Sequence, residues 1–342
     1  MDESEEIHKQ VIGFQAEIAN VQTAIADFEC GHNLNIAIIG EPYSGKTSLI
    51  NEIERMNPDK VSRISLSSII LDRNEIQIAE ESKRVFLMDD CNFLYMRRIG
   101  GFEYLEEFLK SAISNGKIFI TSWNLYSWNY LDEVINVGRY FPVQIKLPKF
   151  TTDQIKECIL SNYKEKEIRF EEDVEFEKEK VIEPKKYAFL IKPLEKTINI
   201  PYFTINYSLL KIRLLKRKER VEIEDIIFEK IHHVSNGNPG VAKIIWQKSL
   251  EYPVIKPSKI KDESFNIDLD YNESFVLNII LSMKSIKNDE LSEIMGPDYQ
   301  VDRIIYRLSK QGLVGSKEGF YFIKPEALKS IVEFQKKLRL VW

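Results

Sequence analysis

The sequence predicts an α/β fold: a doubly wound parallel sheet with a helical lid and a C-terminal winged-helix domain. Over residues 10–150, short apolar runs rich in β-branched residues alternate with amphipathic stretches, which is typical of parallel strands joined by helices. A glycine-rich loop follows the first of these runs. Residues 269–342 follow a different pattern, three short helices and then a β-hairpin, which is the order of elements in a winged helix.

The composition is that of a globular chain. Its 342 residues are 44% hydrophobic and 30% charged, which excludes wholesale disorder and a fibrous repeat. No run approaches the roughly 18 apolar residues of a transmembrane helix, and the acidic N-terminus lacks the apolar stretch of a secretory signal. The three cysteines (Cys30, Cys91 and Cys158) have no C-x-x-C spacing, so we expect a reducing, cytoplasmic location. A net charge of −5 argues against non-specific polyanion binding by the whole surface.

The first domain, residues 10–150, is expected to contain five buried strands. These are residues 34–39, 61–66, 85–88, 118–120 and 143–147, with helices at 46–56 and 102–113. Residues 7–28 allow two interpretations. Their apolar residues recur in steps of four and three, as in a coiled-coil helix, but Gly13 interrupts that pattern at a cost of roughly 1 kcal/mol relative to alanine. The alternative is a turn at Gly13, with the helix starting after it.

The loop from Gly40 to Thr47 has the P-loop pattern G-x-x-x-x-G-K-[ST], between an expected strand and an expected helix. In this pattern, backbone N–H groups and a helix N-terminus surround a phosphate, Lys46 contacts the β- and γ-phosphates, and the Thr47 hydroxyl binds Mg²⁺. We therefore expect ATP or ADP and Mg²⁺ as ligands. The nucleotide-binding residues are Gly40, Glu41, Pro42, Tyr43, Ser44, Gly45, Lys46, Thr47 and Ser48.

A pair of carboxylates follows the third expected strand. Asp89 and Asp90 come directly after the apolar run 85–88, about 40 residues beyond the P-loop. In that position Asp89 is expected to help bind Mg²⁺ through a water molecule. Asp90 could orient or activate the water that attacks the γ-phosphate.

Two further residues are candidates for a role at the phosphate. Asn124 follows the fourth expected strand and could sense the γ-phosphate, with Thr121 as another candidate; alternatively, Asn124 simply caps the next helix. Arg139 precedes the fifth expected strand. It could stabilise transition-state charge as an arginine finger, or it could form a surface ion pair.

Residues 151–252 are expected to form a helical lid that carries an insertion at 163–221. The insertion begins with mixed charges typical of a solvated segment and continues with two expected strands. Its last part overlaps a basic stretch at 209–222, which could contact a polyanion or protect an exposed edge strand. Residues 253–268 have the composition of a linker.

The winged helix is expected at residues 269–342. Asn272 and Asn288 are the expected caps of its first two helices, and Gly312 ends the third. Basic side chains on the third helix and in the turn of the hairpin could contact the bases and phosphates of double-stranded DNA. The alternative is a winged helix that binds only protein. The candidate DNA-binding residues are Arg303, Arg307, Lys310 and Lys317.

The order of these motifs resembles that of AAA+ and STAND ATPases, in particular the archaeal ATPase and origin-recognition-like branch, whose members often carry a C-terminal winged helix. The segments that carry the resemblance are VIGFQAEI, GEPYSGKTSL, FLMDD, ITSWN, GRYFPVQIKLPKFTTDQI and SNGNPGVA. The resemblance covers most of residues 10–165 and 222–342 and does not include the insertion.

The resemblance implies roles for several residues. Val11 and Ile12 would pack on the adenine, Pro239 would belong to the lid element that closes over the nucleotide, and Asn124 would be the polar sensor. The chain departs from the AAA+ pattern by having Asp90 where glutamate is usual and by lacking a sensor arginine near Gly240. These departures favour slow hydrolysis.

We therefore expect an ATP-binding ATPase of the AAA+/STAND type, acting as a slow Mg-ATP-dependent switch. In such a switch, the lid and the winged helix change their contact with DNA or with a protein partner when nucleotide binds. The alternative is a nucleotide-bound DNA-binding regulator or adaptor that does not hydrolyse ATP. Arg139 acting in trans would imply a homo-oligomer.

Overall fold

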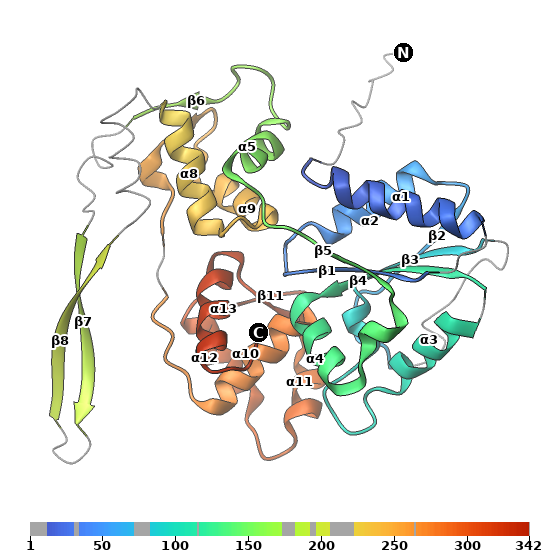
Figure 1. Ribbon diagram of the computed structural model, residues 1–342. Coiled ribbons are helices and arrows are strands. Elements are labelled where there is room, and N and C mark those ends of the chain that lie inside the picture. Colours follow the sequence, from blue (N-terminus) through green and yellow to red (C-terminus); the bar gives the residue numbers. More distant parts are fainter. Residues whose placement is uncertain are drawn as a thin grey trace. The chain divides into compact units, whose positions relative to one another are not determined.

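The computed structural model describes most of the chain, and Figure 1 shows it as a ribbon. The described residues are 12–30, 34–71, 83–114, 116–172, 182–191, 196–205, 222–262 and 265–341. Within these residues, no helix combines the length and the apolar character needed to cross a bilayer. Contacts divide the chain into two compact units. The first consists of Met1–Phe150, Asn238–Val241 and Glu263–Trp342, and the second of Thr151–Gly237 and Ala242–Asp262.

A five-stranded parallel sheet is the centre of the first unit, with the strand order β2-β3-β4-β1-β5. The strands are β1 (Ile36–Gly40), β2 (Val61–Ser65), β3 (Val85–Asp89), β4 (Ile118–Asn124) and β5 (Val143–Lys146). Every residue of β1, β3 and β4 is buried, which explains why β1, β3 and the first half of β4 are almost continuously apolar in sequence. The predicted α/β class with a parallel, P-loop-bearing sheet is confirmed.

The register of the sheet brings the polar strand ends together. Gly40 at the end of β1 pairs with Asn124 at the end of β4, and Ser65 at the end of β2 pairs with Asp89 at the end of β3. Because all five strands run in the same direction, the P-loop, Asp89 and Asn124 lie at one edge of the sheet.

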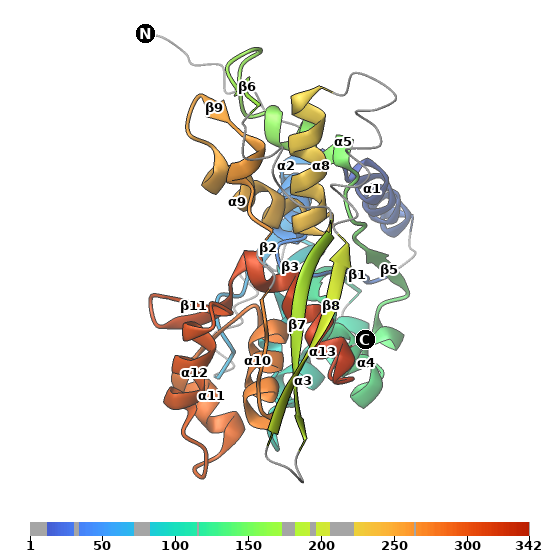
Figure 2. The same cartoon turned by 90° about the vertical axis from the view of Figure 1, so that its left-hand side faces the viewer.

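Helices cover both faces of this sheet. Figure 1 and Figure 2 show α1 (Gln15–Glu29) and α2 (Lys46–Met56) on one face, and α3 (Glu103–Ser114) and α4 (Leu125–Ile135) on the other. Helix α1 starts after Gly13, as the second interpretation of the N-terminal pattern predicts. Gly13 has a φ of +85°, and a Cβ there would lie 2.5 Å from the ring of Phe150, so both the backbone and the packing require glycine.

The second unit is mostly helical. It contains α5 (Thr152–Leu160), α8 (Ile223–Ser235) and most of α9 (Pro239–Ser249). Its core includes a cluster of Phe170, Phe228 and Trp246, in which the last two rings are stacked with their centroids 5.4 Å apart.

Part of the segment expected to be a linker is folded into the second unit. Strand β9 (Val254–Ile255) pairs in parallel with β6 (Arg169–Phe170), and a short 3-10 helix, η5 (Pro257–Lys259), follows it. Within the insertion, β7 (Ile182–Ile191) and β8 (Lys196–Ile205) form an antiparallel hairpin. Apart from Glu222, the basic stretch at 209–222 lies outside the described residues.

The C-terminal part of the first unit has three helices and a three-stranded antiparallel sheet with the strand order β10-β12-β11, followed by a last helix. Its elements are α10 (Tyr271–Met283), β10 (Ser285–Lys287), α11 (Asn288–Met295), α12 (Val301–Lys310), β11 (Val314–Lys317), β12 (Phe320–Ile323) and α13 (Leu328–Lys337). This is the expected winged-helix order, with β10 added to the expected hairpin.

Two expected helix caps are wrong. The residue that caps α10 is Asp270, not Asn272: its carboxylate accepts from the N–H of Glu273 at 2.9 Å, and the Glu273 side chain accepts in return from the N–H of Asp270. Asn288 is the first residue of α11 and donates instead to Asp302 of α12 at 2.9 Å. The α10 box outcompetes the nearby asparagine because it satisfies two backbone donors.

Candidate active site

The P-loop connects β1 to α2 through a tightly packed turn. Gly45 precedes α2 with a φ of +94°, and a Cβ there would lie 2.9 Å from the ring of Phe14. Gly40 ends β1, and a Cβ there would lie 2.4 Å from the Ser44 hydroxyl oxygen. Gly45 is therefore required by its backbone conformation and by the ring of Phe14, and at Gly40 the space beside Ser44 favours glycine.

Lys46 is buried inside the loop that it belongs to. Its Nζ donates to the carbonyl of Gly40 at 2.9 Å and to that of Glu41 at 2.8 Å. Burial lowers the pKa of Lys46 from 10.5 to about 8, and Asp90 opposes this effect. A buried ammonium group whose hydrogen-bond partners here are backbone carbonyls should bind negatively charged phosphate oxygens strongly.

The P-loop hydroxyls and Asp89 suit a nucleotide with Mg²⁺. The hydroxyl oxygen of Ser44 is buried and has no hydrogen-bond partner among the residues that the structure describes. Thr47 and Ser48 are exposed in the first turn of α2. Within the described residues, no three His, Cys, Asp or Glu side chains are grouped to hold a metal ion. A Mg²⁺ site here would therefore use the Thr47 hydroxyl, the Asp89 carboxylate, water and phosphate oxygens, the oxygen ligands that this ion prefers.

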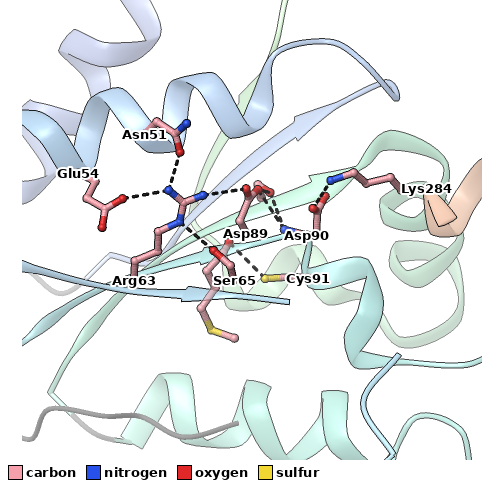
Figure 3. Close-up of polar contacts among 10 residues, drawn as sticks. Asn51, Glu54, Arg63, Ser65, Asp89, Asp90, Cys91 and Lys284 are labelled. Carbon is pink, nitrogen blue, oxygen red and sulfur yellow. Dashed lines mark hydrogen bonds and ion pairs between the residues drawn. The ribbon is translucent and has the colours of Figure 1, made fainter. Parts of the chain in front are cut away.

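Asp89 is held at the end of β3 by three neighbours. Its Oδ1 accepts from the Ser122 hydroxyl at 2.5 Å and from the N–H of Asp90 at 3.1 Å. Its Oδ2 lies 3.4 Å from Arg63, which also forms an ion pair with Glu54 at 2.9 Å (Figure 3). Arg63 and Ser122 were not among the sequence candidates, although both lie at or near the ends of strands that flank β3.

Asp90 contacts the winged helix. Lys284, the residue after α10, forms an ion pair with its Oδ2 (Figure 3). Burial raises the pKa of Asp90, and Lys284 opposes that shift. Both residues have a positive φ, so the backbone is locally constrained on each side of this contact.

Three side chains of the core bind the last carbonyls of α10. Asn124 donates to Leu281 O at 2.8 Å, Ser127 to Ser282 O at 2.7 Å, and Asn92 to Met283 O at 3.0 Å. A helix leaves its last four carbonyls without partners in the helix, so these contacts satisfy groups that otherwise need water. The C-terminus of α10 is thus docked at the edge of the sheet where the P-loop and Asp89 lie.

Asn124 uses both ends of its amide in this arrangement. Its Oδ1 accepts from the N–H of Tyr126 at 3.0 Å and caps α4, as the alternative interpretation predicts, while its Nδ2 is bound to Leu281. Thr121 donates to Ile36 O and accepts from the Trp123 indole, so it is occupied within the sheet.

The outer side of the P-loop contacts two other segments of the first unit. The Tyr43 hydroxyl donates to Ile323 O at the end of β12 at 2.6 Å, and burial raises the pKa of this phenol to about 12. Asn238 donates to Pro42 O at 2.8 Å, and the N–H of Gly240 donates to Tyr43 O at 3.0 Å. Pro239, the lid residue implied by the resemblance, lies between these two contacts.

Within the described residues, none of the remaining candidates forms a hydrogen bond or an ion pair with the P-loop. Arg139 lies 4.7 Å from the centre of the Tyr140 ring and donates to its hydroxyl. Ile12 is half-buried in the turn before α1, and Val11 lies outside the described residues. On the winged helix, Arg307 forms an ion pair with the buried Glu273 at 2.5 Å. Arg303, Lys310 and Lys317 are exposed.

No protein-family model matches this chain, and no curated protein does. Solved structures that are similar over nearly the whole length include the following three. The Holliday-junction branch-migration motor RuvB of Thermotoga maritima has a TM-score of 0.41 at 17% identity, covering 94% of this chain and 95% of that chain. The ORC2 protein of Aeropyrum pernix has a TM-score of 0.44 at 12% identity, with 98% and 97% covered. Cdc6p of Pyrobaculum aerophilum has a TM-score of 0.44 at 13% identity, also with 98% and 97% covered.

The fold class rests on the order of the five strands and on the P-loop between β1 and α2.

Proposed function

We propose that this protein binds Mg-ATP, hydrolyses it slowly and works as a switch whose winged helix leaves the active site during each cycle. The observation that carries the proposal is that Asp90 and Asn124, two groups suited to act on the γ-phosphate, are both bonded to the end of α10. Nucleotide and winged helix therefore compete for the same side chains.

The P-loop residues are proposed to bind the triphosphate. The N-terminus of α2 and the loop N–H groups would surround the β-phosphate, with Lys46 moving from the loop carbonyls to the β- and γ-oxygens. Thr47 and, through water, Asp89 would hold Mg²⁺. The ion would supply positive charge that offsets the charge of the phosphates. Ser122 keeps the Asp89 carboxylate oriented through its hydrogen bond.

Asp90 is proposed to orient the attacking water and to accept its proton. Both tasks require a carboxylate oxygen that is accessible to water. In this structure, Oδ2 of Asp90 is bound to Lys284 instead. Turnover is then limited by the fraction of molecules in which α10 has moved away, which gives a physical reason for slow hydrolysis.

The experiment that tests this function measures ATP binding by calorimetry and phosphate release on the same purified protein. We expect binding that Lys46→Ala removes, and phosphate release that Asp90→Asn lowers by at least tenfold while ATP binding is retained. Equal phosphate release from the native protein and both variants would exclude ATP hydrolysis by this site. ATP binding without any phosphate release would favour the alternative function, a regulator that binds nucleotide and does not hydrolyse it.

DNA binding by the winged helix is a second candidate function. Tyr306 is 62% exposed on α12, and Lys310 lies beside its ring, 5.4 Å from the centre. Together with Arg303, these residues would present a basic and aromatic surface to the major groove, with Lys317 near the phosphates. If several phosphates are contacted, the affinity for a DNA duplex should fall steeply with salt, and Arg303→Gln should weaken it. An affinity for DNA that does not change with salt concentration would favour a winged helix that binds a protein partner.

A further inference from the structure

A pocket of about 160 Å³ lies in the first unit between α4 and the segment that follows α13. This volume has room for on the order of ten water-sized groups. Its polar lining consists of Arg97, Tyr126, Asn129, Tyr130 and Arg339, and none of the described lining residues carries a carboxylate. Two arginines thus share one small pocket.

The Arg97 guanidinium is fixed in place by neutral groups. It lies over the ring of Tyr130, 3.9 Å from the centre, and it donates to Asn278 Oδ1 at 2.7 Å and to the Ser282 hydroxyl at 3.5 Å. Its Nε is buried and has no hydrogen-bond partner in the described part of the chain. Since a guanidinium has five N–H donors, Arg97 retains capacity for an acceptor. Among the described residues, none of its hydrogen-bond partners is negatively charged.

Arg339 occupies a position that usually requires glycine. It follows the cap of α13 with a φ of +57°. The N–H groups of Arg339 and Leu340 each donate at 3.0 Å to carbonyls of the last helical turn, a helix ending in which glycine is strongly preferred. A left-handed arginine costs roughly 1 kcal/mol relative to glycine. The fold therefore retains a charged side chain beside the pocket where glycine is easier to accommodate.

We propose that this pocket binds a small oxyanion with at least two negative charges, a phosphate or a polycarboxylate, between Arg97 and Arg339. The planar guanidinium group matches the oxygen spacing of carboxylates and phosphates. An apolar ligand would leave both positive charges unscreened, whereas an oxyanion neutralises them and accepts from the guanidinium donors that remain available.

The anion would connect the core to the C-terminal segment. Arg97 belongs to the core, and its partner Asn278 on α10 donates in turn to Leu340 O at 3.2 Å beside the pocket. On the other wall, Tyr126 donates to the P-loop residue Glu41 at 3.2 Å. An anion in the pocket would therefore contact residues that are hydrogen-bonded to α10 and to the P-loop. The proposal goes beyond the ATPase function and does not require it.

The test is a calorimetric titration of the Lys46→Met chain with pyrophosphate and, separately, with citrate at constant ionic strength. This substitution removes the P-loop ammonium, and methionine fills the same space. We expect saturable binding of one of the two anions, weakened at least roughly tenfold by Arg339→Gly because a charge-assisted hydrogen bond is lost. Glycine favours the left-handed backbone at this position, so the variant should fold at least as well as its parent.

The control is Lys336→Gln, which removes an exposed positive charge from the last turn of α13 and should leave anion binding unchanged. Binding of pyrophosphate alone would identify a phosphate ligand, and binding of citrate alone a carboxylate. The absence of saturable heat with either anion overturns the proposal, as does an affinity that survives Arg339→Gly. No ATP is present, so these results are independent of whether the protein is an ATPase.

Discussion

The side chains of Lys284 and Asp90 form an ion pair that joins the end of α10 to the end of β3, across 194 residues of sequence. Asp90 has a φ of +57° and Lys284 one of +71°. A left-handed backbone at a non-glycine residue costs on the order of 1 kcal/mol or more. The pair is partly shielded from water because the Asp90 side chain is only 9% exposed.

Replacing Lys284 by glutamine should raise the rate of ATP hydrolysis. The ion pair favours the docked winged helix by about 1 kcal/mol, since the Lys284 side chain is half-exposed and screened. Its loss should increase the undocked fraction, and with it phosphate release at saturating ATP, by roughly fivefold.

The matched control is Lys287→Gln, which makes the same charge change three residues later, where the ammonium lies 5.1 Å from the centre of the Phe320 ring. It should leave turnover unchanged. If Lys284→Gln instead lowers the rate at least as much as Asp90→Asn does, Lys284 assists the reaction. The proposal that α10 and nucleotide compete for Asp90 is then wrong.

Ser127→Ala should weaken the docking of α10 without touching any group proposed to act on ATP. The Ser127 hydroxyl is fully buried, lies 3.0 Å from the Tyr95 hydroxyl and donates to Ser282 O. Its removal leaves a buried carbonyl unpaired, so the free energy of unfolding in urea should fall by about 1–3 kcal/mol. Ser161→Ala removes a hydroxyl bonded to Cys158 O on an exposed surface and should change it by less than about 0.5 kcal/mol. Equal effects of the two substitutions would contradict the docking contact.

The P-loop could be predicted from sequence because all its determinants are local. The glycines, Lys46 and the start of α2 lie within a few residues of one another, and each has one conformational or electrostatic reason to be there. The order of strands and helices likewise follows from the period of apolar residues.

The docking of α10 could not be predicted in the same way. Its acceptors are backbone carbonyls, which every residue has, and its donors come from three separate positions of the core. Asn124 illustrates the limit. Its sequence position is compatible with a helix cap or a phosphate sensor, and only the tertiary contact reveals that its amide nitrogen is bonded to Leu281 O. The cap of α10, by contrast, was predicted wrongly at Asn272, although the Asp270–Glu273 spacing is that of a capping box.

The affinity for nucleotide should depend on pH through Lys46. Its pKa in the empty site is about 8, so below pH 8 the ammonium is charged and binds phosphate, and above pH 8 it becomes neutral. A bound polyphosphate favours the charged form, so binding should take up a proton at high pH. The affinity for ADP should then fall by about tenfold per unit above pH 8.

Calorimetry in buffers of different ionisation enthalpy measures that proton directly. At pH 9 we expect uptake of most of one proton per ADP bound, and at pH 7 almost none. In Lys46→Arg the guanidinium stays charged throughout this range, so its ADP binding, weaker or not, should show no uptake. Equal uptake by the native protein and Lys46→Arg would assign the proton to another group.

Gly240→Ala should destabilise the protein although it lies in a helix. Alanine in place of glycine near the start of α9 should by itself stabilise the helix by up to about 1 kcal/mol. A Cβ at this position, however, would lie 2.4 Å from the backbone carbonyl oxygen of Tyr43, which also accepts the N–H of Gly240 at 3.0 Å. Backbone at that distance must move, and such overpacking costs about 1–3 kcal/mol, so the clash outweighs the gain in helix propensity. Thermal unfolding should therefore occur at a lower temperature, and ATP affinity should fall because the contact between Gly240 and the P-loop is broken. A variant with unchanged or higher thermal stability and native ATP affinity would mean that the start of α9 does not hold the P-loop.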